Sequence, residues 1–75
     1  MSRLINGDLF TIYDMYEYRE LLYSGDSLKA AKQAIKDRVY DTSAECDIVI
    51  YAPSTVENDL YDYLDEVMDY VNSLL

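Results

Sequence analysis

The sequence predicts a small α+β domain with element order ββαβα, in which a three-stranded sheet carries two helices on one face. Three observations predict it: two segments with helical spacing of apolar residues, a short β-branched run between them, and an aromatic-rich region ahead of them. A chain of 75 residues allows a single domain over residues 1–75 with one hydrophobic core. The alternative is a mostly α-helical chain with one short strand.

The first 24 residues are compatible with two structures. Residues 9–13 and 18–23 are rich in aromatic side chains and are expected to pair as a hairpin with its turn near 16–17. Because no Asn-Gly or Asp-Gly turn is present there, the connection should be a longer loop. The other possibility is a single helix, capped by Asp8 and stopped at Gly25. That helix would place four residues inward: Leu9, Ile12, Tyr16 and Tyr23.

A helix is predicted from about Ser27 to Tyr40. Gly25 ends the preceding structure, and Asp26 or Ser27 can cap the helix. Its apolar stripe consists of Leu28, Ala31, Ile35 and Val39, and Lys29, Lys32 and Lys36 follow one flank. With the strands on either side of it, this helix would form a parallel crossover.

The last third of the chain predicts a strand and a long helix. Residues 46–51 are few and rich in β-branched side chains, which is typical of a strand buried in part on both faces. After Pro53, Ser54 and Glu57 have the spacing of a capping box, so a helix is expected over 55–74. Its apolar stripe repeats every three or four residues: Leu60, Leu64, Val67, Val71 and Leu74.

Charge is distributed unevenly along the chain. Residues 1–38 carry six acidic and six basic side chains, whereas 39–75 carry nine acidic side chains and no basic one. The net charge of −9 therefore belongs to the second half. Such a chain is repelled by nucleic acid and by anionic membranes and is attracted to basic surfaces. We expect no direct binding to nucleic acid or membranes.

Enzymatic activity is not expected, and neither is a cofactor or metal ion. The chain has no histidine, and Cys46 lies between two acids that raise the pKa of a thiol, so it is expected to be a small buried apolar side chain. Asp59, Asp62 and either Asp65 or Glu66 could chelate a divalent cation, but carboxylates at helical spacing are more typical of a solvated helix face. A single cysteine, no signal-peptide pattern and no run of ~20 apolar residues favour the cytoplasm.

The predicted last helix carries an acidic face opposite its apolar stripe. Its members recur at intervals of three or four residues: Asp59, Asp62, Asp65, Glu66 and Asp69. Neighbouring like charges in a helix cost ~0.2–0.5 kcal/mol per pair, and no lysine or arginine in the helix offsets them. A helix that needed only solubility would usually mix both signs. This unrelieved cost favours a binding role for the acidic face.

Tyrosine is the second unusual feature, with nine in 75 residues. These are too many for a small core, so some must be exposed. Tyr61 and Tyr63 alternate with acids along the last helix, a composition suited to binding arginine-rich surfaces through charge-assisted hydrogen bonds and cation–π contacts.

In size, charge and tyrosine content the chain resembles the small phage-encoded inhibitors, among them anti-CRISPR proteins and anti-restriction DNA mimics. The resemblance covers the acidic second half of the chain and involves no sequence motif. It implies a viral protein in the host cytoplasm that blocks nucleic-acid access to a basic host complex, with a CRISPR effector as the first candidate. The residues implied to bind this partner are Asp59, Tyr61, Asp62, Tyr63, Asp65, Glu66 and Asp69.

The leading hypothesis is therefore an inhibitor that acts as a monomer or a homodimer. The alternative is an interaction or homo-oligomerisation module that pairs through the apolar stripe of the last helix.

Overall fold

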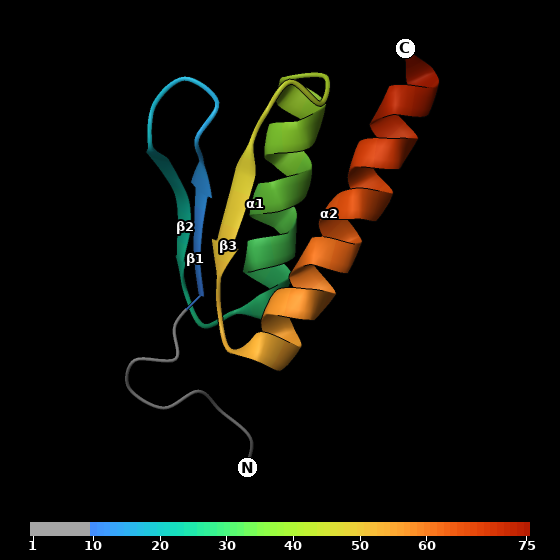
Figure 1. Ribbon diagram of the computed structural model, residues 1–75. Coiled ribbons are helices and arrows are strands. Elements are labelled where there is room, and N and C mark those ends of the chain that lie inside the picture. The colour runs from blue at the N-terminus through green and yellow to red at the C-terminus, as the bar shows by residue number, and fades with distance from the viewer. Residues whose placement is uncertain (1–9) are drawn as a thin grey trace.

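The computed structural model describes residues 10–75, which form a three-stranded sheet and two helices (Figure 1). In chain order the elements are β1 (Phe10–Asp14), β2 (Glu20–Gly25), α1 (Leu28–Asp41), β3 (Ile48–Tyr51) and α2 (Ser54–Leu74). The predicted α+β class and ββαβα order are confirmed, and the mostly helical alternative is wrong. Leu9, expected to begin the first strand, and Asp8, the proposed cap of the rival helix, lie outside the described residues.

The sheet has the order β2-β1-β3, and β1 pairs antiparallel with both neighbours. β2 and β3 are therefore parallel to each other, and α1 connects them across the central strand. The register between β1 and β2 is irregular, because Ile12 lies opposite Tyr23 while the next residue, Tyr13, lies opposite Leu21. Leu22 is thus an extra residue, as in a β-bulge.

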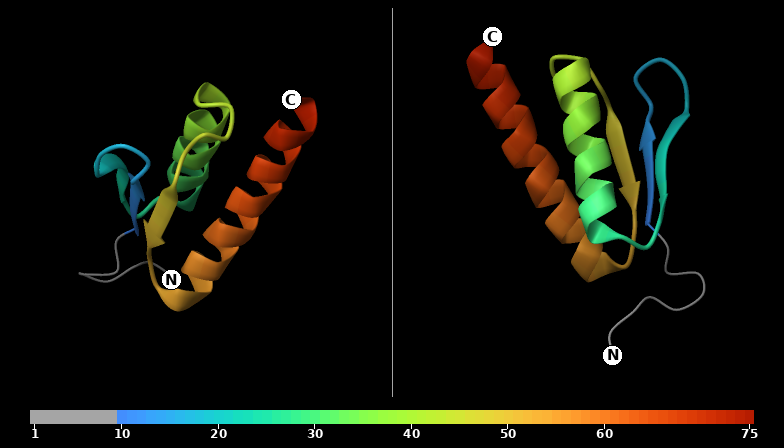
Figure 2. Two further views of the ribbon diagram at one scale, coloured as in Figure 1. Left: turned by 45° about the horizontal axis from the view of Figure 1, so that its top comes forward. Right: turned by 180° about the vertical axis from the view of Figure 1, so that it is seen from behind.

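Both helices lie on one side of the sheet, so the domain has two layers (Figure 2). The core lies between the layers and takes residues from four elements. These are Phe10 and Ile12 of β1, Ala31, Ile35 and Val39 of α1, Ile48 and Ile50 of β3, and Leu60, Leu64, Val67 and Val71 of α2. Alternation along β1 buries every second side chain, as expected for a strand with one covered face.

The helical stripes predicted from the sequence form most of this core. In α1 the first stripe residue, Leu28, remains 38% exposed, and in α2 the last one, Leu74, remains 62% exposed. The other four stripe residues of α2 are buried against the chain's own sheet and α1. A second molecule therefore cannot pair with that stripe while this fold is intact.

The two helices begin differently. Ser27 caps α1, since its side-chain oxygen accepts a hydrogen bond of 3.1 Å from the backbone N–H of Ala30. In α2 the predicted capping box is wrong, because the helix begins at Ser54 and its N-cap is Pro53, with no side-chain capping bond. A serine in the first helical position no longer lies where its hydroxyl can accept from the third helical N–H.

Strand β3 begins two residues later than predicted. Ile48 and Ile50 are buried, Val49 is half-buried and Tyr51 is exposed, so one face of the strand contributes most of its burial. Along the edge of β3, the hydroxyl of Tyr61 accepts a hydrogen bond of 3.0 Å from the N–H of Ile50 and lies 3.4 Å from its carbonyl oxygen. This hydrogen bond attaches α2 to the edge of the sheet. It also occupies a backbone N–H that could otherwise pair with a strand of another chain.

Candidate protein-binding surface

The outer surface of α2 carries the acidic residues that the sequence singled out. A helix repeats every 3.6 residues, so burying the stripe against the sheet directs the residues between its members outward. All five acids are exposed, and we call them the acidic face: Asp59, Asp62, Asp65, Glu66 and Asp69. From first to last they extend over about 15 Å of helix. The structure thus brings the five predicted carboxylates together on one solvent-facing surface.

No basic side chain in residues 10–75 forms an ion pair with the acidic face. The ion pairs of this part of the chain all involve Arg38, which binds the carboxylates of Asp14 and Glu20 on the sheet side of α1. The hydrogen bond to Glu20, together with the negative charges of both carboxylates, raises the pKa of the Arg38 guanidinium. The guanidinium of Arg38 is therefore directed toward the sheet and does not compensate the acidic face of α2.

Two of the three lysines of α1, Lys32 and Lys36, contact tyrosine rings instead of carboxylates. Lys32 Nζ lies 5.3 Å from the ring centroid of Tyr63, and Lys36 Nζ lies 5.7 Å from that of Tyr40. The Tyr40 ring in turn stacks on Tyr70 of α2, with the two centroids 6.2 Å apart. Cation–π contacts at exposed sites are worth roughly 0.5–1 kcal/mol, so they hold the lysines beside the helix pair without neutralising the acidic face.

The two tyrosines predicted to bind a partner lie beside the acidic face and already have contacts within the chain. Tyr61 is half-buried with its hydroxyl against Ile50, and Tyr63 is half-buried beneath Lys32. Tyr70 is the α2 tyrosine that solvent reaches most, at 54% exposure. Its spacing of seven residues from Tyr63 places both rings on the α1 side of the helix, a signal that the sequence contained.

Most of the remaining exposed aromatic surface lies in the loop between β1 and β2 and at the end of β3. Tyr16, Tyr18 and Tyr51 are 60%, 80% and 58% exposed, so the expectation that some of the nine tyrosines reach solvent is confirmed. Tyr16 and Tyr18 lie in the loop between β1 and β2, which Asp14 holds in place. The buried carboxylate of Asp14 accepts hydrogen bonds of 3.0 Å from the backbone N–H groups of Tyr16 and Asp47.

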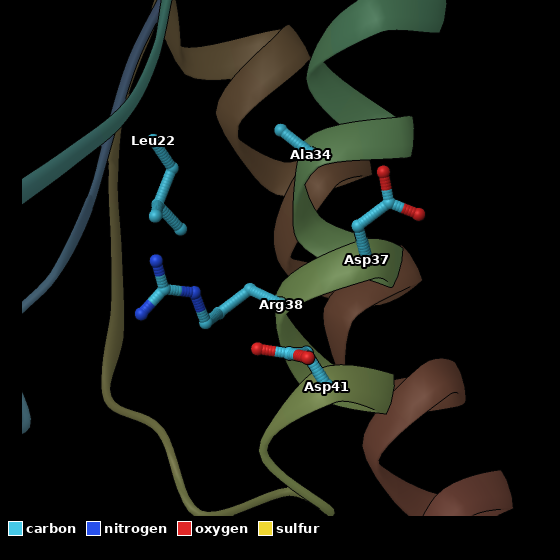
Figure 3. Close-up of a pocket in the computed structure, with 5 residues that line it drawn as sticks. All are labelled: Leu22, Ala34, Asp37, Arg38 and Asp41. Carbon is cyan, nitrogen blue, oxygen red and sulfur yellow. The ribbon is translucent and has the colours of Figure 1, made fainter.

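A groove of about 450 Å³ runs between β2 and α1, lined by Leu22, Ala34, Asp37, Arg38 and Asp41 (Figure 3). Arg38 extends across it toward β2, where its guanidinium is bound by the carboxylates of Asp14 and Glu20. The charged side chains that line it are the carboxylates of Asp37 and Asp41 and the guanidinium of Arg38, which is already paired.

Cys46 does not have the surroundings of a reactive thiol. It is half-buried, and burial is the main cause that raises the pKa of its thiol, with the carboxylates of Asp14 and Asp47 adding to this. A hydrogen bond with Thr42 and the positive charge of Arg38 oppose the rise in the pKa and do not cancel it.

Two further observations concern the described residues as a whole. Within 10–75, no three side chains of the metal-binding types come together in a way that could hold an ion. Neither helix in this range combines the length and the hydropathy needed to cross a membrane.

We compared the chain with protein-family models, with curated proteins and with solved structures, and none of the three comparisons finds a match.

Proposed function

We propose that the protein is a non-enzymatic inhibitor that binds a basic, nucleic-acid-binding host protein through the acidic face of α2. The observation that carries the proposal is that five exposed carboxylates follow one helix face without an ion pair in the described chain. Guanidinium and ammonium groups on another molecule would supply the compensation that the fold itself does not. An RNA-guided CRISPR effector is the first host complex to test, on the resemblance in size and charge described above.

The spacing of the acidic face suits this mechanism. Five carboxylates over about 15 Å give one negative charge per ~3 Å, close to the ~3.4 Å of helix axis that corresponds to each phosphate of one DNA strand. The phosphate-binding cleft of a host protein would then meet a comparable line of charge on a rigid helix. Inhibition would be steric and electrostatic, because the helix occupies the cleft and nucleic acid cannot enter it.

The test is competition for a nucleic-acid-binding site. Purified CRISPR effector complexes are incubated with a fluorescent target duplex, and displacement of the duplex is followed as this protein is added. We expect displacement that weakens steeply as salt rises, since exposed ion pairs are screened. The triple variant D62N/E66Q/D69N should bind roughly 3- to 150-fold more weakly, given ~0.2–1 kcal/mol for each exposed pair lost.

A matched triple variant separates position from total charge. E17Q/D26N/E45Q removes three exposed acids elsewhere in the chain and changes the net charge by the same amount. It should retain most of the binding. Equal losses in the two triple variants would show that only net charge matters, and binding that does not depend on salt would contradict an electrostatic mechanism.

A further inference from the structure

The side of the sheet that faces away from both helices is not covered by any described element, and its composition is unusual. We call it the open sheet face; it consists of Thr11 and Tyr13 of β1, Leu21 and Ser24 of β2, and Val49 and Tyr51 of β3. The register aligns Leu21, Tyr13 and Val49 in one row across the three strands. Tyr51 packs edge-on against Tyr13, with their ring centroids 6.0 Å apart.

This composition departs from what a solvated sheet face requires. In a two-layer domain the uncovered face of an antiparallel sheet usually carries polar side chains. Here Leu21 is 54% exposed and Tyr51 58% exposed, although both occupy outward positions on edge strands. A single exposed apolar residue needs no explanation, whereas an apolar row that spans the whole sheet is typical of an interaction surface.

The charges at the ends of this face favour a second copy of the same chain. Arg19, just before β2, lies with its guanidinium 4.6 Å from the Tyr13 ring centroid and donates a hydrogen bond of 3.0 Å to the Tyr13 hydroxyl. Asp47, just before β3, is exposed, and strand alternation puts it on the same side as Val49. Opposite charges therefore occupy the same end of the two edge strands.

When two copies face each other, a two-fold axis that runs between their sheets, parallel to both β1 strands, makes this arrangement self-complementary. Rotation about that axis lays β2 of one copy over β3 of the other, so that each Arg19 meets the partner copy's Asp47. The same rotation places Leu21 against Val49 and brings the two Tyr13 rings together at the axis. The acidic faces lie beyond the helices, away from this contact, so mutual repulsion between two chains of net charge −9 is kept small.

We propose that two copies of this protein associate back to back through their open sheet faces, in a two-fold symmetric dimer with Arg19–Asp47 pairs at one end. Sheets pack face to face at about 10 Å in this manner, and self-complementary contacts of this kind form closed dimers. Three strands of about five residues have a footprint of only roughly 250 Å². The dimer should therefore be weak, forming as the concentration rises from micromolar toward about 1 mM. It would present two acidic faces on opposite sides.

Sedimentation velocity of the full chain between about 10 µM and 1 mM tests the proposal. We expect the weight-average mass to rise toward that of the dimer, and the rise to be lost in L21E, which places a charge in the apolar row. Tyr70 is as exposed as Leu21 but lies on the α1 side of α2, so Y70E is the matched control and should still associate. Circular dichroism establishes that each variant is folded.

Charge reversal tests the symmetry directly. R19D and D47R should each be monomeric, because each places like charges against each other twice in the proposed dimer. An equimolar mixture of the two should associate again, since the hetero-dimer restores one opposite pair at each contact. Monomeric wild-type chain at about 1 mM, or association that Y70E abolishes and L21E leaves intact, would overturn the proposal. These measurements involve this chain alone, so their outcome is independent of the partner-binding test.

Discussion

Arg38 Nη1 lies 3.0 Å from Oδ2 of Asp14, and this ion pair joins α1 to the central strand of the sheet. Asp14 is the buried acid of the described chain, at 4% exposure, and its other oxygen accepts two backbone hydrogen bonds. The carboxylate thereby orders the β1–β2 loop, the segment before β3 and the last turns of α1. One side chain fixes the end of the sheet from which the exposed tyrosines of the loop project.

The Asp14→Ala substitution should cost about 1–3 kcal/mol of unfolding free energy, since it leaves two backbone donors without their buried acceptor and removes one of the two carboxylates that bind Arg38. Urea unfolding followed by circular dichroism measures the change. Glu20→Gln is the matched control, because Glu20 binds the same guanidinium from an exposed position and should cost no more than about 1 kcal/mol. Similar losses in the two variants would show that the burial of Asp14 does not matter.

Tyr61→Phe tests whether the tyrosine hydroxyl shields the edge of β3. Removing it deprives the Ile50 N–H of its acceptor and should cost about 0.5–1.5 kcal/mol. Hydrogen exchange measured by NMR should show faster exchange at the Ile50 amide, with other amides of the sheet little changed. Tyr63→Phe keeps the ring that contacts Lys32 and should leave the Ile50 amide as slow as in the wild-type protein.

The parts of the fold that the sequence predicts are those governed by periodicity. Stripes such as Leu60, Leu64 and Val67 place one face of a helix in the core regardless of the rest of the chain, and Ser27 caps α1 through a local bond. The prediction for the start of α2 was wrong by one residue. Ser54 was expected to be the N-cap, but Pro53 is the N-cap and Ser54 is the first helical residue, where its hydroxyl cannot cap the helix.

The long-range contacts could not be predicted because spacing along the chain does not determine them. In the sequence, Asp14 is one of two acids between the two predicted strands. Only the pairing of β1 with β3 brings it to Asp47, 33 positions further along the chain. The five carboxylates of the acidic face follow from helical spacing, whereas the half-burial of Tyr61 depends on which strand α2 packs against.

The Cys46 thiol should react slowly with iodoacetamide in the folded protein. Burial raises the pKa of this thiol, so a smaller fraction is thiolate at neutral pH than in the unfolded chain. Alkylation rates measured against pH should have a midpoint above that of the same chain in urea. The same shift stabilises the fold below the pKa of the unfolded thiol, and this contribution is lost as pH rises through the folded value. A midpoint below that of the unfolded chain would instead indicate an activated thiol and reopen a catalytic role.

The acidic face should also destabilise the free protein, which can be measured without knowing its partner. In D62N/E66Q/D69N all the close like-charge pairs of this face disappear, and Asp69 no longer opposes the negative end of the helix dipole. We expect the unfolding free energy to rise by roughly 1–2.5 kcal/mol at low salt. Urea is the suitable denaturant, because guanidinium would itself screen the charges. In about 0.5 M NaCl the gain should shrink, since the wild-type repulsion is then screened.

The control E17Q/D26N/E45Q should show no comparable gain, because these three acids are spread over separate loops and have no helical neighbours of like charge within one turn. If D62N/E66Q/D69N becomes more stable and no longer displaces nucleic acid, the carboxylates of the acidic face contribute to binding and lower the unfolding free energy of the protein. If D62N/E66Q/D69N is no more stable than the wild-type chain at low salt, the acidic face costs nothing, and its lack of internal ion pairs no longer argues for an external partner.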